Sequence, residues 1–462
     1  MLTNVCVLGL GETGLSMVRW AIDSGQVCTV IDDRAHPPML DTLKKEFPGV
    51  TFMSGKLTED FLSQFDALYV SPGVSAYDPA IMAVQKKGVH VLGDIELFAQ
   101  KITALQRQGQ PRPKIVAITG SNGKTTVTTL VGEIAKVAGK LTEVAGNISP
   151  AVLNAAEATL QQGIYPEVWV LEVSSFQLES TYSLNADAAV VLNISEDHLD
   201  RYDDMGSYQA AKERIFIGAE TAIVNRDEKL PQLSEGIRVI SFGLDEPEEG
   251  HFGLRWVDGE EYLSYGQETL MPVKEMQLVG RHNVSNLLGA FALSYAAGLP
   301  FDAMAKVGRT FKGLAHRVEF VCEINGVKFY DDSKGTNVGA TEAALKGAAS
   351  PVVLIAGGQG KGQDFTPLKA ALSNARAVIL IGEDARIIAK ALEGISIPIV
   401  FCDTLEEATV KAFEVSEPGD MVLLSPACAS FDMFKGYAHR AQVFIDTAKA
   451  LKQSTEGSIS KC

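Results

Sequence analysis

Residues 115–138, with the sequence IVAITGSNGKTTVTTLVGEIAKVA, decide the fold of the central part of the chain. The apolar run from Ile115 to Ile118 predicts a buried strand, and the apolar spacing from Val127 to Ala138 predicts a helix. The segment between them, TGSNGKTT at 119–126, contains two glycines and leads directly into the helix. A strand, a glycine-containing loop and a helix N-terminus together direct backbone N–H groups at phosphate oxygens. The stretch therefore predicts an α/β sheet that carries a phosphate-binding loop.

The chemistry expected of this loop is that of a nucleoside triphosphate site. Lys124 would reach the β- and γ-phosphates, and the hydroxyl of Thr125 would bind Mg²⁺. Ile118 stands where the standard G-x-x-x-x-G-K-[ST] motif has its first glycine. The alternative is a chance Gly-Lys-Thr sequence in a turn, which the flanking strand and helix disfavour. The residues expected around the phosphates are Gly120, Ser121, Asn122, Gly123, Lys124, Thr125 and Thr126.

Apolar strand-like runs alternate with helical periods along the whole chain, which is the pattern of α/β proteins with mostly parallel sheets. The length of 462 residues suggests about three domains of roughly 150 residues each. We expect a Rossmann-like domain at 1–98, a P-loop ATPase-like domain at 99–313 and a second Rossmann-like domain at 314–462. The polar stretch from Thr103 to Pro113 is the best linker candidate in the N-terminal half. A hairpin from Glu319 to Tyr330, with an Asn-Gly turn, opens the third domain.

The composition excludes several classes of protein. Lys plus Arg is 41 and Asp plus Glu is 57, and the net charge of −16 argues against non-specific binding of DNA or anionic membranes. No apolar run approaches the ~18 residues that span a bilayer, and the N-terminus lacks the basic flank of a signal peptide. The six cysteines are scattered and form no CxxC pair, as is usual in a reducing cytosol. We therefore expect a cytoplasmic protein without nucleic-acid or membrane partners. Separately from the composition, we expect a monomer.

Two further strands of the central part end in polar groups. The run from Val168 to Val173 carries Glu172 near its end, and His198 follows the run from Ala188 to Ile194. Ligands of open parallel sheets bind outside the carboxyl ends of the strands, where the phosphate loop also lies. Both side chains could therefore approach the Mg²⁺ near Thr125. The alternatives are a surface carboxylate and a structurally satisfied histidine.

The N-terminal part contains Gly9-x-Gly11-x-x-Gly14, followed by Asp32 at the end of the next predicted strand. This spacing matches the dinucleotide fingerprint and, taken alone, predicts NAD. Because the chain also has a triphosphate loop, the turn could instead hold the pyrophosphate of another nucleotide. The segment 32–34, Asp-Asp-Arg, would then face a ribose or a base, or would simply cap a strand end.

Three strands of the third part also end in small or charged residues suited to a small anionic substrate. The segments are DDSKGTN at 331–337, GGQGKG at 357–362 and SPACASFD at 425–432. Backbone donors near Ser430 could hold a carboxylate at a helix start. Lys361 could equally be a solvated surface charge. Cys428 is not expected to be a nucleophile, because no His/Asn pattern supports a thiol enzyme.

Taken together, these segments resemble the Mur ligase family, the ATP-dependent amino-acid ligases of peptidoglycan synthesis. The resemblance covers essentially the whole chain and includes the family's shortened phosphate loop, which accounts for Ile118. The matching blocks, in order, are TGSNGKTT (119–126), LEVSSFQLE (171–179), NISEDHLDRY (193–202), GRHNVSN (280–286), AHRVE (315–319) and DDSKGTN (331–337). Four further blocks resemble the D-glutamate-adding branch: GLGETGLS (9–16), SPGV (71–74), GDIELF (93–98) and SPACASFDMFKGYAHR (425–440).

The resemblance implies a set of binding residues for each ligand. The UDP of the substrate would be bound by Thr13, Asp32, Asp33, Arg34, Ser71 and Gly73. The muramoyl-alanine arm would lie along Asn147, Ser174 and His198. The adenine and ribose of ATP would be framed by Asn283, Asn286, Arg317 and Asp332. D-Glutamate would be held by Lys334, Thr336, Lys361, Ser430 and Tyr437.

The resemblance also implies the catalytic and metal-binding groups. The catalytic set would be Lys124, Glu172, His198, Lys212 and Lys334, and the ligands of two Mg²⁺ ions would be Thr125, Glu172, His198 and Lys212. Lys212 would serve as a ligand after carbamylation. The chain departs from the family pattern at Gln359, where Asp is frequent, and at Tyr437, where Phe is usual. Both departures concern the D-glutamate pocket.

The reaction implied is the addition of D-glutamate to UDP-N-acetylmuramoyl-L-alanine through an acyl phosphate, with release of ADP and phosphate. Lys124 and Mg²⁺ would neutralise charge while the reactants are held in line. The alternatives are another amino-acid ligase of the same family, an NAD-dependent oxidoreductase built on the Gly9–Gly14 turn, and a nucleotide-dependent binding protein without ligation chemistry.

Overall fold

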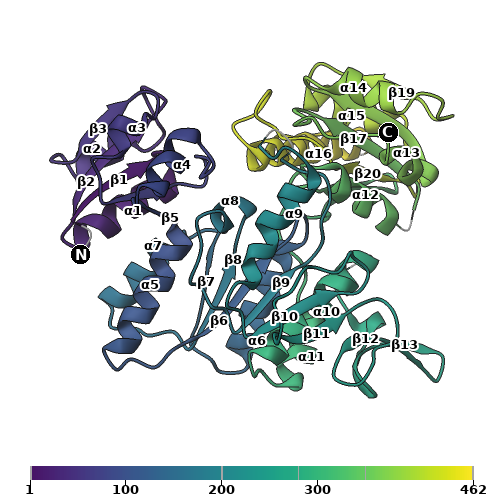
Figure 1. Cartoon of the computed structure of the whole chain (residues 1–462). Coiled ribbons are helices and arrows are strands. Elements are labelled where there is room, and N and C mark those ends of the chain that lie inside the picture. Colours follow the sequence, from purple (N-terminus) through teal and green to yellow (C-terminus); the bar gives the residue numbers. More distant parts are fainter. Residues whose placement is uncertain (1–2, 199–200, 279, 349, 460–462) are drawn as a thin grey trace. The chain divides into compact units, whose positions relative to one another are not determined.

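The computed structural model describes residues 3–198, 201–278, 280–348 and 350–459, and it contains three sheets flanked by helices (Figure 1). Strands and helices alternate along most of the chain, and most neighbouring strands run parallel. The expected α/β fold with three mostly parallel sheets is confirmed. None of the described helices combines the length and apolar character that crossing a bilayer requires.

The first sheet has five parallel strands in the order β3-β2-β1-β4-β5. Its strands are β1 (Asn4–Leu8), β2 (Val27–Asp32), β3 (Thr51–Ser54), β4 (Ala67–Val70) and β5 (His90–Leu92). Its helices are α1 (Glu12–Asp23), α2 (Leu40–Glu46), α3 (Glu59–Leu62) and α4 (Pro79–Lys86). The strand order reverses between β1 and β4, so a ligand crevice is expected beyond the carboxyl ends of these two strands.

The second sheet has nine strands in the order β14-β13-β12-β11-β10-β9-β6-β8-β7. Its parallel part consists of β6 (Lys114–Thr119), β7 (Thr142–Gly146), β8 (Val168–Glu172), β9 (Ala188–Val191), β10 (Thr221–Asn225) and β11 (Arg238–Phe242), which β12 (Phe252–Val257) continues. The strands β13 (Glu260–Tyr265) and β14 (Glu268–Pro272) extend it in antiparallel fashion. Its helices include α6 (Lys124–Val137), α7 (Val152–Gln161), α8 (Ser175–Leu178), α9 (Met205–Glu213), α10 (Arg281–Ala296) and α11 (Phe301–Thr310). Because β6 lies between β8 and β9, the carboxyl ends of these three strands meet at one edge.

The third sheet has six strands in the order β15-β16-β20-β17-β18-β19. It begins with the predicted hairpin, β15 (Glu319–Ile324) and β16 (Val327–Asp331). The parallel strands are β17 (Val352–Gly357), β18 (Ala375–Ile381), β19 (Ile399–Phe401) and β20 (Met421–Leu424). The helices are α12 (Val338–Gly347), α13 (Leu368–Ala371), α14 (Ala385–Ala391), α15 (Leu405–Glu414) and α16 (Tyr437–Ile459). Because β20 lies between β16 and β17, the loops that follow these three strands are brought together.

The described residues form two compact units. The first unit comprises 1–194, 206–275 and 286–309 and includes the first two sheets, and the second comprises 195–205, 276–285 and 310–462. Within the first unit, one apolar core contains residues of both sheets, and the rings of Phe98 and Trp169 lie 4.9 Å apart.

Helix α5 (Asp94–Arg107) corrects the predicted linker. Residues 103–107 are helical, and only 108–113 of the expected linker lie outside regular structure. Ile102 packs against the apolar core, and this packing stabilises the helical conformation of residues 103–107. The expected boundary at residue 98 falls inside α5, and the three-domain division remains a prediction.

Two carboxylates of α5 hold the segment that follows β8. Asp94 accepts a hydrogen bond of 2.9 Å from the side chain of Gln177. Glu96 accepts bonds of 2.8 Å from the backbone N–H groups of Tyr182 and Ser183. The first and second sheets are therefore joined by buried polar contacts as well as by the apolar core.

Candidate active site

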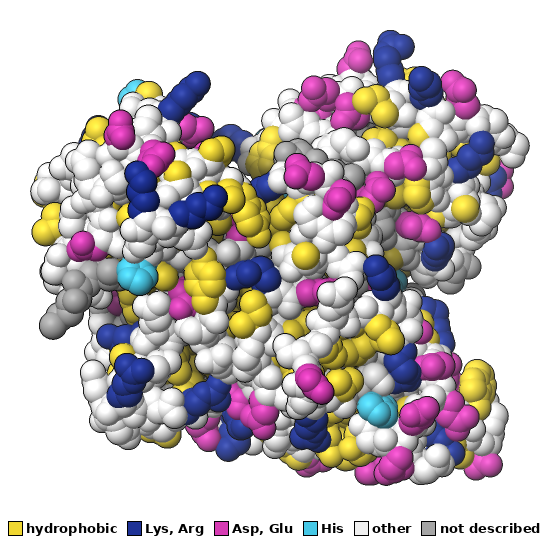
Figure 2. Space-filling model, in the orientation of Figure 1, with side chains coloured by type: hydrophobic (Ala, Val, Ile, Leu, Met, Phe, Trp, Pro, Cys, Tyr) yellow, Lys and Arg dark blue, Asp and Glu magenta, His cyan; other side chains and the backbone are white. Residues whose placement is uncertain are grey.

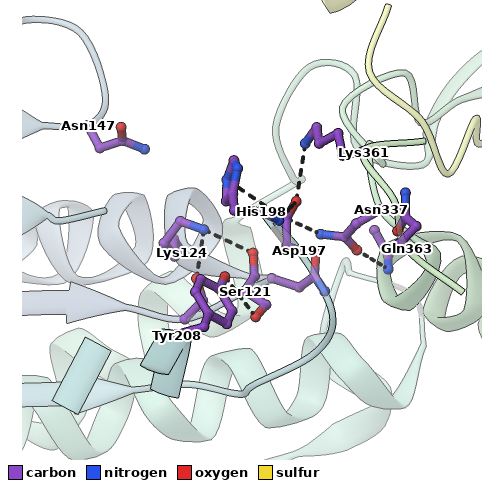
Figure 3. Close-up of polar contacts among 12 residues, drawn as sticks. Ser121, Lys124, Asn147, Asp197, His198, Tyr208, Asn337, Lys361 and Gln363 are labelled. Atoms are coloured by element: carbon purple, nitrogen blue, oxygen red, sulfur yellow. Dashed lines mark hydrogen bonds and ion pairs between the residues drawn. The ribbon is translucent and has the colours of Figure 1, made fainter. Parts of the chain in front are cut away.

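The loop after β6 has the geometry of a phosphate-binding loop (Figure 3). Gly120 has φ +154°, and Gly123, the N-cap of α6, has φ +81°. Residues that carry a side chain rarely adopt either backbone conformation. A Cβ atom on Gly123 would lie 2.4 Å from Oδ1 of Asn286, so that residue of α10 packs against the loop. Nζ of Lys124 donates hydrogen bonds of 2.8 and 2.9 Å to the carbonyl oxygens of Gly120 and Ser121. The predicted loop and Asn286 are thus brought together.

Asn193, which follows β9, anchors the same loop. Its Oδ1 accepts a hydrogen bond of 2.8 Å from the N–H of Asn122, and its carbonyl oxygen accepts one of 3.0 Å from the N–H of Ser121. Its Nδ2 also donates to the carbonyl oxygen of Asn122 at 3.1 Å. Asn193 is not among the site residues predicted from the sequence. The available signal was its position just after a strand that pairs with β6.

Glu172 ends β8 beside the phosphate loop and is 2% exposed. Its Oε1 accepts a hydrogen bond of 3.0 Å from the side chain of Asn147. Its Oε2 is buried and has no hydrogen-bond partner among the described residues. A buried carboxylate oxygen without a donor is costly unless a cation or another donor reaches it. Glu172 therefore fits a hard divalent cation, and Thr125 in the first turn of α6 could supply a hydroxyl ligand.

Lys212 lies on α9 with only 2% of its surface exposed. Its Nζ donates a hydrogen bond of 3.0 Å to the carbonyl oxygen of Gly120 and lies 4.6 Å from the ring centre of Tyr208. The hydroxyl of Tyr208 lies 3.2 Å from Oγ of Ser121. Lys212 is therefore not an exposed helix lysine, because the folded chain brings it to the phosphate loop.

A cleft of about 930 Å³ opens at the carboxyl ends of β1 and β4, as the strand order predicts. Segment 146–151 and Gln177, from the second sheet, also line it. The site residues predicted from the sequence that line this cleft are Thr13, Asp32, Asp33, Arg34, Ser71, Gly73 and Asn147. The structure thus brings the whole predicted UDP set to one cavity, together with one residue of the predicted muramoyl-alanine arm. Ser174 caps α8, and its N–H donates a hydrogen bond of 3.0 Å to the side chain of Gln177.

The glycine-rich turn at this cleft is stabilised by Asp32. A Cβ atom on Gly14 would lie 2.0 Å from the carbonyl oxygen of Gly9, so α1 packs directly on the turn. Asp32 accepts hydrogen bonds of 2.7 Å from the N–H of Leu10 and from the guanidinium of Arg34. Burial opposes ionisation, but these bonds hold the pKa of Asp32 below its ordinary value. Asp32 therefore orders the turn and Arg34, in addition to lining the cleft.

The second unit brings together the residues predicted to bind D-glutamate. Gln359 and Ala429 exchange two backbone hydrogen bonds, of 3.0 and 2.9 Å, which join the glycine-rich turn to the loop of Ser430. Nζ of Lys334 lies 5.2 Å from the ring centre of Tyr437. The side chain of Gln359 donates a hydrogen bond of 3.2 Å to Glu383. Thr336 lies in the loop after β16, beside Lys334.

Asp197 is a site residue that the sequence analysis did not select. It forms an ion pair of 3.1 Å with Nζ of Lys361 and accepts a hydrogen bond of 3.4 Å from Asn337 (Figure 3). Lys361 is therefore not simply a solvated charge. His198 has φ +57°, and its N–H donates a hydrogen bond of 3.0 Å to Asp197. Because His198 belongs to the second unit, its role near the Mg²⁺ site of the first unit remains a prediction.

The residues predicted to frame adenine and ribose are divided between the two units. Asn286 belongs to the first unit, and Asn283, Arg317 and Asp332 belong to the second. Burial raises the pKa of Asp332 to about 7, against the opposing effects of the Ser425 hydrogen bond and the Arg317 charge.

A side-chain cluster that the sequence analysis missed lies at the start of the third sheet. Side-chain atoms of His316, Glu319 and Asp331 that are able to bind a metal lie within 4.8 Å of one another. Nδ1 of His316 is 2.6 Å from a carboxylate oxygen of Asp331. Glu319 accepts a hydrogen bond of 2.9 Å from the backbone N–H of His316, and Asp331 accepts one of 2.8 Å from the backbone N–H of Ser333.

Family models match all three parts of the chain. The Mur ligase MurD-like N-terminal domain matches residues 3–93, the Mur ligase middle domain 118–294 and the Mur ligase glutamate ligase domain 316–428. A Methylobacillus flagellatus protein named UDP-N-acetylmuramoylalanine--D-glutamate ligase is 50% identical over 97% of each chain. A Thiobacillus denitrificans protein of the same name is 49% identical, over 97% of this chain and 96% of its own.

Solved structures share the fold at lower identity. MurF from Acinetobacter baumannii has a TM-score of 0.60 at 17% identity, over 96% of this chain and 93% of its own. A pseudomurein peptide ligase type C from Methanothermus fervidus has a TM-score of 0.59 at 19% identity, over 96% and 99%. Because relatives about half identical in sequence extend over nearly the whole chain, and all three of its parts match the family models, the chain belongs to the Mur ligase family.

Proposed function

We propose that this chain is an ATP-dependent ligase that joins D-glutamate to UDP-N-acetylmuramoyl-L-alanine, a step in peptidoglycan precursor synthesis. The observation that carries the proposal is the 49–50% identity, over nearly the whole chain, to enzymes named for this reaction. The scattered cysteines, five of which are free thiols in the described residues, suit a reducing cytoplasm, where we place the enzyme.

The first step joins two anions, because the alanyl carboxylate attacks the γ-phosphate of ATP to form an acyl phosphate and ADP. Lys124 supplies a positive charge at the loop that would hold the phosphates, and the backbone N–H groups at the start of α6 add a positive dipole. Mur ligases use Mg²⁺, which would lower the repulsion between the two anions and which Thr125 and Glu172 would hold here. The chain's contribution is to position the reactants in line.

The second step forms the amide bond. The amine of D-glutamate attacks the acyl carbon, and phosphate leaves from the tetrahedral intermediate. Lys334, Lys361 and the backbone near Ser430 would orient the carboxylates of D-glutamate so that its amine faces that carbon. The supporting observation is that the loops carrying these residues follow three adjacent strands, β16, β17 and β20.

We also propose that Lys212 is carbamylated. The neutral amine would react with CO₂ to give a carbamate and release a proton, replacing a cation with an anionic oxygen ligand suited to Mg²⁺. The supporting observation is that Lys212 is buried beside Gly120 of the phosphate loop, where Mg²⁺ is expected. A free ammonium has no lone pair with which to bind a metal, whereas a carbamate has oxygen ligands.

Replacement of Lys212 tests the carbamate directly. Lys212→Ala is expected to be nearly inactive and to be partly rescued by added small carboxylates. A carbonyl signal in ¹³C NMR after equilibration with ¹³CO₂ should be present in the wild type and lost in Lys212→Ala. The exposed Lys229 serves as a control, and Lys229→Ala should keep both the signal and the activity. Full activity of Lys212→Ala in CO₂-depleted buffer would show that no carbamate is needed.

Release of ADP separates the candidate functions. The proposal requires release that depends on both UDP-N-acetylmuramoyl-L-alanine and D-glutamate, with the amide product detected by mass spectrometry. Each omission, and replacement of D-glutamate by L-glutamate, should reduce the rate to background. Product formed with a different amino acid would identify another ligase of the family. Hydride transfer with NAD would favour an oxidoreductase, and ATP binding without product would favour a binding protein.

A further inference from the structure

Arg440 is a buried guanidinium between two loops of the second unit. It is the fourth residue of α16 and is 0% exposed. Its Nε and Nη2 donate hydrogen bonds of 3.0 and 2.8 Å to Oγ and the carbonyl oxygen of Ser333. Its Nη1 donates to the carbonyl oxygens of Cys428 and Ala429 at 3.1 and 3.4 Å. One planar group therefore joins the loop after β16 to the loop after β20.

All four acceptors of this guanidinium are uncharged. Among the described residues Arg440 forms no ion pair, although buried charges in proteins are ordinarily paired with an opposite charge. Asp331, Asp332 and Asp432 lie near enough to favour its charged form, but none contacts it. Burial lowers the pKa of Arg440 to about 10, which still leaves the side chain charged at neutral pH.

The position of Arg440 on its helix also disfavours its positive charge. The first turn of a helix already carries a partial positive charge, so a cation is disfavoured there unless an anion lies nearby. The residues that directly follow its loop acceptors are Lys334, after Ser333, and Ser430, after Ala429. Both belong to the set predicted to hold D-glutamate, which carries two carboxylates. The three aspartates favour this charge without forming an ion pair with it, and an anionic ligand at these loops would stabilise it further.

We propose that Arg440 is a positioning residue for the amino-acid substrate. It holds the loops of Lys334 and Ser430 at the spacing needed to bind the substrate, and its buried charge attracts the substrate's carboxylates without touching them. The inference rests on the proposed D-glutamate ligase function. It differs from a purely structural role, in which Arg440 would only maintain the fold of the second unit.

The test compares Michaelis constants in the full-length enzyme. Arg440→Lys keeps the charge but cannot bridge two loops, and Arg440→Met removes both. We expect KM for D-glutamate to rise about tenfold to a hundredfold in Arg440→Met, and less in Arg440→Lys, because hydrogen bonds to a charged group are lost. KM for UDP-N-acetylmuramoyl-L-alanine should change by less than about twofold, since its predicted cleft lies in the first unit.

Two further variants keep the result interpretable. Arg440→Gly opens a space that free guanidinium can enter, and added guanidinium should lower its KM for D-glutamate. Ser333→Ala removes one acceptor while keeping the charge, and it should raise that KM only severalfold, even if the larger changes prevent folding. The matched control is Arg376→Met, which removes an arginine of the same unit that pairs with Glu417 and Asp420.

The outcomes separate the two proposals. A selective rise in KM for D-glutamate, with rescue by guanidinium, would support the positioning role. A lower thermal midpoint with unchanged KM for D-glutamate in Arg440→Lys and Ser333→Ala would overturn it and leave only a structural role. Wild-type enzyme without D-glutamate-dependent ADP release would overturn the proposed function, and with it the inference.

Discussion

The ammonium group of Lys124 donates hydrogen bonds to two carbonyl oxygens of the phosphate loop. The same charge can turn to phosphate oxygens without moving the backbone, because the lysine side chain has four rotatable carbons. We expect Lys124→Ala to lower kcat by about a hundredfold or more, since one donor at a developing negative charge is typically worth that much. Steady-state release of ADP measures the loss.

The control for this variant lies on the same helix. Lys136 is exposed on α6 and forms a surface ion pair with Glu133, so Lys136→Ala should leave kcat unchanged. Circular dichroism should show the same thermal midpoint for wild type and both variants. Near-normal turnover in Lys124→Ala would remove this residue from the mechanism.

Single residues divide into those that a motif reveals and those that only the fold reveals. Lys124 and Thr125 could be selected because they belong to a recognisable loop motif between a strand and a helix, and Glu172 because it lies at the end of a strand. Asn193 and Arg440 were not, since their partners depend on which strands become neighbours and how two loops approach each other. Lys212 was selected only through the family resemblance, because nothing local distinguishes it from an exposed helix lysine.

At the scale of elements, the packing of α1 on the glycine turn should be sensitive to one methyl group. Gly14→Ala would place its Cβ 2.0 Å from the carbonyl oxygen of Gly9 and must displace the helix or the turn. We expect a loss of about 1–3 kcal/mol in the free energy of unfolding and weaker binding of the UDP-linked substrate. Gly11→Ala in the same turn is the control, because its Cβ would meet nothing within 4 Å. Equal thermal midpoints for the two variants would contradict the packing argument.

The elements themselves were largely predictable. The buried strand β6 contains the whole predicted run from Ile115 to Ile118 and extends one residue beyond each of its ends, since both faces of a parallel sheet exclude water. The linker at Thr103–Pro113 was misplaced because its polar composition outweighed the apolar spacing of Ile102 and Leu105. Tertiary packing of that apolar face on the core extends α5 beyond what local composition indicates.

For the whole molecule, two buried carboxyl groups predict a characteristic dependence of stability on pH. Burial raises the pKa of Asp94 to about 6 and that of Asp332 to about 7, above their values in an unfolded chain. The folded state therefore binds these protons more strongly, and their contribution to stability falls as pH rises from about 4 to about 7. Asp332→Asn should flatten part of that fall, measured as the thermal midpoint across this range. The exposed Asp403→Asn should leave the profile unchanged.

The cleft at the glycine turn has walls from two sheets, and this matters for the search for inhibitors. A truncated chain ending at residue 98 would keep the turn but lose segment 146–151 and Gln177 from the opposite wall. It would also expose Asp94 and Glu96, whose hydrogen-bond donors lie beyond the cut. Compounds selected against such a fragment would be optimised for an open surface that the intact enzyme does not have. Screens for ligands of this cleft should therefore use the full-length chain.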